Sequence, residues 1–245
     1  MFVNPASAIN YQIRRSQRVK TLRIVVKPDR VEVVAPPLMA LSQIQAFVSK
    51  QQAWIQQASE RVKIKAARNA IGFAPGEYHQ GAEIPFQDHK LQLTLSTHRG
   101  KRTRIQQPDH SSLLLELPEQ LATDMHSAAI RLALTAWMKQ QAKQQAEQLI
   151  ALHAPRFGLY PRSVRIKTQK SRWGSCGPYN DINLNWLLIM APSSAFEYVV
   201  VHELCHIQHK NHSPAFWQLV EEHLPHYQLS RRWLKQHGAR LMQGL

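Results

Sequence analysis

The chain has 245 residues, which is enough for one large domain or two small ones with a buried core. Its 44% hydrophobic and 19% charged residues exclude a disordered chain, and no apolar run approaches the roughly 18 residues that span a bilayer. Only two cysteines are present and no signal peptide is recognised, so we expect no disulfide framework and a cytoplasmic location. The formal charge of +15 favours acidic partners, among them nucleic acid bound through a basic surface.

The first part of the chain, residues 1–120, is predicted to be rich in β-structure with one helix. The expected elements are strands at 21–26, 31–34, 91–95 and 113–117 and a helix at 41–65. The first two strands are β-branched and are separated by turn residues, so we expect a hairpin. Ser42 is the expected cap of the helix.

From residue 121 the pattern changes to long helices separated by short strands, which predicts a second domain at 121–245. The expected elements are helices at 125–152, from 194 through 206, from 214 and at 227–237, with strands at 164–167 and 182–189. Ser194 and Glu197 have the spacing of a capping box, and Ser213 precedes a proline as helix caps often do. The residues expected to end helices are Pro155, Gly158 and Gly238.

The strongest chemical signal is the segment His202-Glu203-Leu204-Cys205-His206. On a helix, His202 and His206 lie one turn apart on the same face, where two imidazoles can bind one zinc ion. Glu203 is turned about 100° away, so it can act as general base toward an activated water without being a ligand. The apolar run 199–201 favours a buried helix over a solvated helix with surface histidines. The pattern therefore predicts a zinc-dependent hydrolytic site.

A catalytic zinc with one open position needs a third protein ligand. His209 lies seven residues beyond His202, a rise of about 10.5 Å, which is too far on a regular helix. His212 is better placed if Asn211 adopts the left-handed conformation that ends a helix and turns the chain back. This ligand spacing is that of metzincins, although a histidine replaces their glycine and no Met-turn is found. Glu222 on the next helix remains an alternative ligand.

Four motifs stand in order and at close spacing in the C-terminal half. They are Ser171-Arg172-Trp173-Gly174-Ser175-Cys176, Ile182-Asn183-Leu184-Asn185-Trp186, the run from Val199 to His206, and Asn211-His212-Ser213-Pro214-Ala215-Phe216-Trp217. With these motifs the chain resembles the YgjP-like metallopeptidases, a family of predicted zinc peptidases related to the SprT and WLM (Wss1p-like) groups. The N-terminal hairpin and Trp54-Ile55 also resemble the family, whereas residues 65–125 match it least.

The resemblance implies a peptidase that uses one Zn²⁺ ion, acts on protein or peptide substrates, and has His212 as its third ligand. The fold that we expect is α+β, with a β-rich N-terminal part followed by a zincin-like unit whose metal-binding helix packs on a small sheet. Arg172 is a candidate contact of the substrate. Asn185 is another, because the strand at 182–189 is expected to pair with an extended peptide. Cys176 is interpreted as a buried thiol rather than a nucleophile or ligand.

Two other interpretations remain open. The protein could be an SprT-like peptidase that acts on nucleic-acid-associated proteins, as the SprT resemblance and the charge of +15 suggest. Alternatively, the zinc could be structural and the chain a non-catalytic binding module. A structural site is closed by four protein ligands, and Glu203 would then have no evident use.

Overall fold

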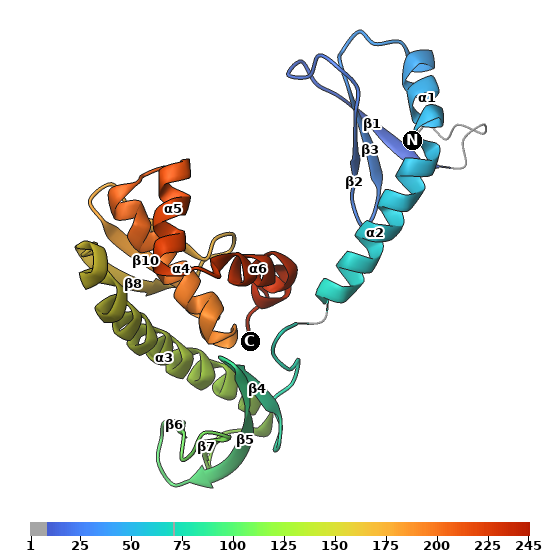
Figure 1. The fold of residues 1–245 in the computed structure, drawn as a ribbon. Helices are drawn as coiled ribbons and strands as arrows, with labels where there is room; N and C mark the ends of the chain where they lie inside the picture. The colour runs from blue at the N-terminus through green and yellow to red at the C-terminus, as the bar shows by residue number, and fades with distance from the viewer. Residues whose placement is uncertain (1–8, 71) are drawn as a thin grey trace. The chain divides into compact units, whose positions relative to one another are not determined.

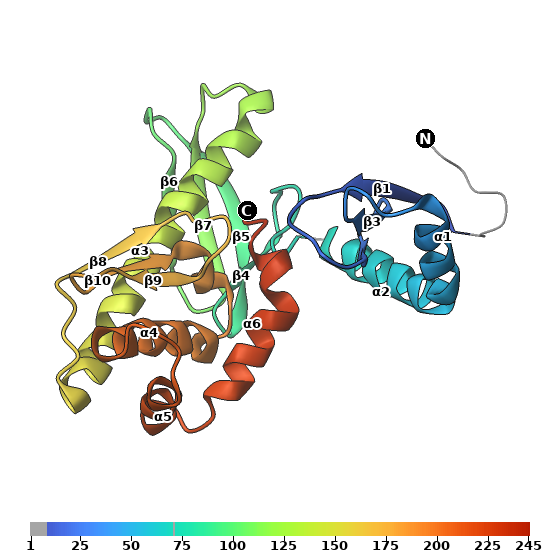
Figure 2. The same ribbon diagram turned by 90° about the horizontal axis from the view of Figure 1, so that it is seen from above.

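The computed structural model describes residues 9–70 and 72–245, without the side chains of residues 65 and 68–70. The chain divides into two compact units, Met1–Ile71 and Gly72–Leu245 (Figures 1 and 2). Within the described residues there are three small sheets together with α-helices, so the predicted α+β class is confirmed. None of the described helices is long and apolar enough to cross a membrane.

The first unit is a three-stranded sheet with two helices on one face. Its elements are β1 (Tyr11–Arg15), β2 (Arg23–Val26), β3 (Val31–Ala35), α1 (Leu41–Lys50) and α2 (Gln52–Ala70). The expected hairpin is confirmed, because β2 pairs antiparallel with β3, and the unpredicted β1 pairs parallel with the other side of β3. Val33 of β3 packs with Ile44, Val48 and Ile55 of the helices in a core of its own.

The single helix expected at 41–65 is two helices in the structure. The backbone leaves the helical conformation at Gln51, with φ −100° and ψ 9°. The spacing of apolar residues continues across this break, so the hydrophobic periodicity of the sequence does not reveal that the helix is interrupted. Ser42 is not the cap; Ala40 is, and its N–H donates to the side-chain oxygen of Gln43 at 3.4 Å.

The second unit begins with a four-stranded sheet in the order β4-β5-β7-β6. The strands are β4 (Glu83–Phe86), β5 (His89–His98), β6 (Arg104–Gln106) and β7 (Ser112–Pro118). The expected strands at 91–95 and 113–117 lie within β5 and β7, which pair in parallel. The two edge strands, β4 and β6, were not predicted.

A short 3₁₀ turn, η1 (Thr123–Met125), leads into the long helix α3 (His126–Phe157). Leu134 and Met138 of α3 share one buried cluster with Leu93 of β5 and Leu115 of β7. The boundary expected at residue 120 therefore falls inside a compact unit, because the strands before it and the helix after it share a core. The helix does not stop at Pro155 but continues through it and ends at Gly158, whose φ of 67° is left-handed as predicted.

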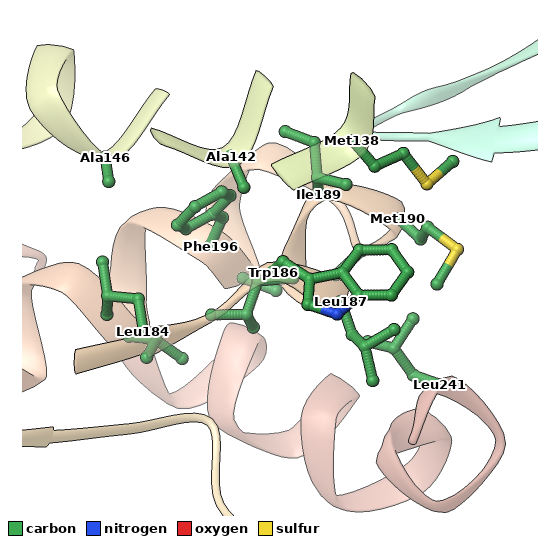
Figure 3. Close-up of a cluster of buried hydrophobic side chains, with 14 of the residues drawn as sticks. Met138, Ala142, Ala146, Leu184, Trp186, Leu187, Ile189, Met190, Phe196 and Leu241 are labelled. Carbon is green, nitrogen blue, oxygen red and sulfur yellow. The ribbon is translucent and has the colours of Figure 1, made fainter. Parts of the chain in front are cut away.

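The chain then forms a three-stranded sheet and three closing helices. These are β8 (Ser163–Lys167), β9 (Gly174–Cys176), β10 (Asp181–Asn185), the 3₁₀ segment η2 (Trp186–Met190), α4 (Ser193–Gln208), α5 (Pro214–His223) and α6 (Tyr227–Leu241). The strand expected at 182–189 ends at Asn185, and the five residues of η2 are all buried (Figure 3). β10 is the central strand, parallel to β8 and antiparallel to β9, and α4 packs beside this sheet as expected (Figure 2).

Two helix-end predictions in this region are wrong. Glu197 does not complete a capping box; its carboxylate is 2.8 Å from Nε2 of His153. The N–H of Ser193, the first residue of α4, donates to the carboxylate of Asp88 in the turn between β4 and β5. Gly238 does not end α6. A Cβ there would lie 3.1 Å from Cζ2 of Trp173, so the glycine lets the helix approach that ring closely.

Candidate metal centre

The helix α4 positions two of the predicted site histidines. Its middle is the buried apolar run Val199-Val200-Val201, which packs into the core of the second unit. Burial of this run fixes the rotation of α4 about its axis. His202 and His206 follow the run and lie one turn apart on the same side of the helix. Their ring centres are 4.9 Å apart, with the rings at 87° to each other.

His212 reaches the same place from the connection between α4 and α5. Its ring centre is 5.0 Å from that of His202 and 4.8 Å from that of His206. One ring nitrogen of each of the three lies within 4.8 Å of the others. Among the described residues this is the group that could hold a metal ion, and neither Glu222 nor His209 belongs to it.

The turn that returns His212 is not the one expected from the sequence. Asn211 is not left-handed, since Gln87 and Asn180 are the non-glycine residues with positive φ in the described ranges. Instead α4 ends at His209 in an extended conformation, with φ −118° and ψ 101°. The side chain of Asn211 then accepts a hydrogen bond from the N–H of Ser213 at 3.2 Å, which closes the turn.

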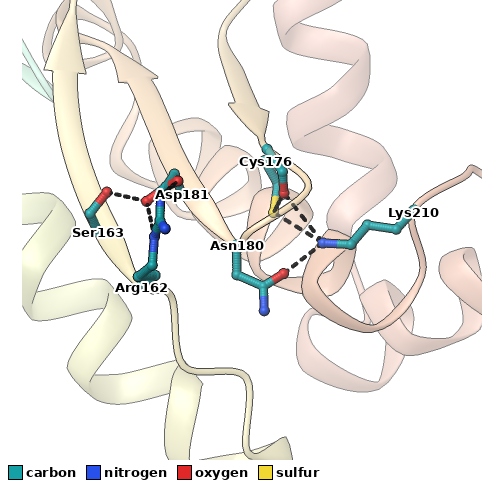
Figure 4. A network of polar contacts seen from close by, with 7 residues as sticks. Arg162, Ser163, Cys176, Asn180, Asp181 and Lys210 are labelled. Carbon is teal, nitrogen blue, oxygen red and sulfur yellow. Dashed lines mark hydrogen bonds and ion pairs between the residues drawn. The ribbon is translucent and has the colours of Figure 1, made fainter.

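A polar network ties this turn to the sheet (Figure 4). Lys210 donates to the side-chain oxygen of Asn180 at 2.6 Å, next to the first residue of β10. That residue, Asp181, pairs with Arg162 and accepts from the hydroxyl of Ser163, and these bonds lower its pKa to about 2. The segment that carries His212 is therefore anchored to the turn between β9 and β10, and the start of β10 is in turn held to the start of β8.

The positions of all three histidines, and the protonation of His206 and His202, fit a divalent metal. Nδ1 of His206 lies 2.9 Å from the carbonyl oxygen of His209, so the proton sits on Nδ1 and the lone pair of Nε2 is left for a metal ion. Burial, together with the charges of His206 and His212, lowers the pKa of His202 to about 3. Nε2 of His202 and Nε2 of His212 face each other at 3.1 Å. Neutral imidazoles with converging nitrogens are what zinc binds.

Glu203 is a buried carboxylate beside this group, with 5% of the residue exposed. Burial raises its pKa to about 8, opposed by a hydrogen bond from the backbone N–H of Cys176 and by the charge of Arg172. The backbone of β9 packs directly against this carboxylate, because a Cβ at Gly174 would lie 2.5 Å from Oε1 of Glu203. The carboxylate is thus held between α4 and β9 by close contact and one hydrogen bond.

Two aromatic residues of α5 pack on the imidazoles. The ring of Phe216 stacks on that of His206 at 4.5 Å and 27°, and Trp217 stacks on His212 at 5.6 Å and 21°. Ser213 begins α5 as predicted, since its side chain accepts from the N–H of Phe216 at 3.3 Å. The sequence predicts a helix over these two aromatics but indicates no part for them in the site. Their position directly after the helix cap is the signal that points to such a part.

The model of the YgjP-like metallopeptidase domain matches residues 20–237. The chain belongs to this family. Membership makes it a metallopeptidase, a hydrolase of protein or peptide substrates with a metal cofactor, and confirms the family resemblance that the motifs indicated. No curated protein matches the chain.

Among solved structures, the crystal structure of the metallopeptidase zymogen abylysin of Pyrococcus abyssi is similar over a limited region. It is 23% identical, with a TM-score of 0.34, and the match covers 37% of this chain and 93% of that chain.

The two residues suggested as substrate contacts lie in different surroundings in this YgjP-like chain. Arg172 is exposed just before β9, close enough to Glu203 to act on its pKa. Asn185 is 0% exposed, and its side-chain amide donates to the carbonyl oxygens of Gln169 at 2.9 Å and of Arg172 at 3.2 Å. Asn185 therefore holds the segment before β9 in place and has no surface to offer a substrate, and its strand β10 is already paired on both sides.

The two cysteines are free thiols. Cys205 is buried within α4. Cys176 is half-buried, and burial raises the pKa of its thiol while Lys210 opposes the rise. A raised pKa disfavours the thiolate that a nucleophile or metal ligand needs.

Proposed function

We propose that this metallopeptidase is zinc-dependent, with His202, His206 and His212 as the ligands and Glu203 as the general base. The observation that carries the proposal is the convergence of three imidazoles beside a buried carboxylate. Three nitrogen ligands with a fourth position open are typical of catalytic zinc. When bound there, zinc would activate water and polarise the carbonyl of the peptide bond.

Glu203 supplies the proton transfers. Its raised pKa of about 8 makes it a stronger base than an exposed carboxylate, and a catalytic pKa near the working pH is favourable for such transfers. Glu203 accepts a proton from the attacking water and returns it to the amide nitrogen as the carbon–nitrogen bond breaks. The N–H of Cys176 and the bare backbone of Gly174 keep the carboxylate aimed during both transfers.

An extended substrate is best accommodated along β9 rather than β10. β10 is hydrogen-bonded to a neighbour on each side, whereas β9 is an edge strand and lies against Glu203. Edge strands bind peptides by adding a further strand through main-chain hydrogen bonds. N-methylation of the amides that flank the cleaved bond should therefore raise KM, and an unchanged KM would contradict this path.

The decisive experiment compares wild type with Glu203→Gln for zinc content and for cleavage of a quenched peptide library. We expect both to bind one zinc and only wild type to cleave. Glu222→Gln is the matched control, because it makes the same change on α5 outside the ligand group and should retain activity. Full activity of Glu203→Gln would show that the site is not catalytic and would favour a structural zinc.

A second candidate function is peptidase action on proteins associated with nucleic acid. The unit Met1–Ile71 has twelve Lys and Arg residues against three Asp and Glu residues, so it holds nine of the +15 charges. Arg14, which also pairs with Glu32, and Arg23 flank Val34 in register, on the face of the sheet opposite α1 and α2. Cations arrayed on an open face suit a phosphate backbone.

This candidate is tested by the binding of a fluorescent single-stranded oligonucleotide at increasing salt. We expect affinity that falls steeply with salt, and a smaller slope for the double variant Arg14→Ser and Arg23→Ser. The double variant Lys50→Ser and Arg61→Ser removes equal charge from the helices and should bind as wild type does. Absence of binding at low salt would exclude this function.

A further inference from the structure

A cationic side chain lies beside the three histidines. Arg231 of α6 is exposed, and its guanidinium carbon is 4.5 Å from the centre of the Trp217 ring. The same indole stacks on His212 at 5.6 Å and lies 5.8 Å from the ring centre of His202. A single aromatic side chain therefore separates this guanidinium from two of the three imidazoles.

Arg231 lies beside the site although it comes from a different helix. Its contact with Trp217, and the contacts of Trp217 with His212 and His202, place the positive charge of Arg231 next to the metal-binding group.

A second arginine comes from the segment that leads to the general base. Arg172 is exposed just before β9, Asn185 fixes its backbone carbonyl, and Gly174, two residues further on, lies against Glu203. A third cation, Lys210, donates a hydrogen bond to Asn180 and stabilises the connection between α4 and α5. Two of the three cations around the site are therefore available for another partner.

The availability of these two arginines contrasts with others in the chain. Arg14 pairs with Glu32 and Arg162 with Asp181. Within the ranges that the structure describes, the guanidinium groups of Arg231 and Arg172 form no ion pair with a carboxylate. Cations placed around a metal ion repel it, so their presence opposes metal binding unless an anion joins them. Unfavourable electrostatic interactions of this kind are expected at a functional site whose ligand supplies the missing charge.

We propose that the site selects peptides that carry a carboxylate close to the cleaved bond, with Arg231 as the principal specificity-determining residue and Arg172 as the second. The inference rests on the proposed peptidase function and names its substrate class. A planar guanidinium can bind a carboxylate through two parallel hydrogen bonds, which a lysine cannot reproduce. An acidic side chain or the free C-terminal carboxylate of a short substrate would supply the anion that the site lacks.

The test uses a quenched peptide that wild type cleaves and its variants with Glu or Gln at each position flanking the cleaved bond. We expect wild type to prefer one Glu peptide by about tenfold in kcat/KM, the size of one charge-assisted hydrogen bond. Arg231→Gln should abolish that preference mainly through KM, so that this variant cleaves the Glu and Gln peptides with equal kcat/KM. Arg232→Gln is the control, because it removes the same charge from the next position of the same helix and should keep the preference.

The outcomes separate this inference from the peptidase proposal. Equal cleavage of Glu and Gln peptides by wild type would overturn the selectivity and leave the peptidase intact. Equal loss of the preference for the Glu peptide in Arg231→Gln and Arg232→Gln would also overturn the selectivity, because the effect would then be one of overall charge. If no peptide is cleaved, binding of labelled Glu and Gln peptides to zinc-loaded Glu203→Gln still decides the selectivity. Equal affinities there would refute it.

Discussion

The close approach of β9 to the general base gives a sharp test of the site through one methyl group. In the substitution Gly174→Ala, the new Cβ would lie 2.5 Å from Oε1, 2.7 Å from Cγ and 2.9 Å from Cδ of Glu203. Carbon and oxygen atoms in contact normally stay about 3.5 Å apart, so the carboxylate must move by about 1 Å. The side chain can turn away while α4 and β9 stay in place.

A displacement of that size at a reacting group costs on the order of 100-fold in rate, or about 2.7 kcal/mol in activation free energy. We therefore expect Gly174→Ala to lower kcat by about 100-fold while zinc content stays at the wild-type level, because the three atoms nearest to the new methyl group all belong to Glu203. Gly177→Ala is the matched control. Its Cβ would meet the carbonyl oxygen of Asp181 at 3.6 Å, an ordinary contact, so activity should be retained.

The assay is steady-state cleavage of a peptide that wild type cuts, with zinc content and thermal unfolding measured on the same preparations. Wild-type kcat in a folded Gly174→Ala protein would refute the reasoning, since the base would then tolerate displacement. Loss of zinc from that variant would also refute it, because the methyl group would be disturbing the ligands instead of Glu203.

Three further predictions concern stability. Ser213→Ala removes the cap from the N–H of Phe216 and should lower the free energy of unfolding by about 1 kcal/mol in urea titrations. Asn185→Ala leaves two partly buried carbonyl oxygens without their donor and should cost about 1–3 kcal/mol; a change near zero would contradict the positioning role. Burial, with His153 and Arg156, lowers the pKa of His223 from 6.5 to about 4. The folded chain therefore binds fewer protons than the unfolded chain in that window, so stability should fall as pH drops from 6.5 to 4. His223→Phe should flatten this part of the pH profile, and an unchanged profile would assign it to other groups.

Much of the site follows from residues that are close to one another in the sequence. The spacing of His202, Glu203 and His206 needs only the helical repeat to bring two imidazoles to one face, and the run before them predicts burial. Ser213 and the proline after it start a helix through interactions within one turn. Such features depend on residues close in the chain, so they can be read without the fold.

Other elements are decided by contacts between distant segments. The helix cap at Ser193 comes from Asp88, and Glu197 turns to His153 instead of to its own backbone. The helix α3 continues through Pro155, because neighbouring packing outweighs the loss of one hydrogen bond near its end. Local capping rules compare only nearby partners, so they cannot anticipate these exchanges.

The sequence by itself determined the zinc-type motif, the α+β class and the identity of the candidate general base. Only the tertiary structure decided that Asn185 is buried, that β9 rather than β10 is an edge strand, that Gly174 adjoins Glu203, and that Arg231 adjoins Trp217. The physical reason is distance along the chain. Helical periodicity and caps act within a few residues, whereas sheet order and the packing of α6 are set by burial of apolar surface from the whole unit.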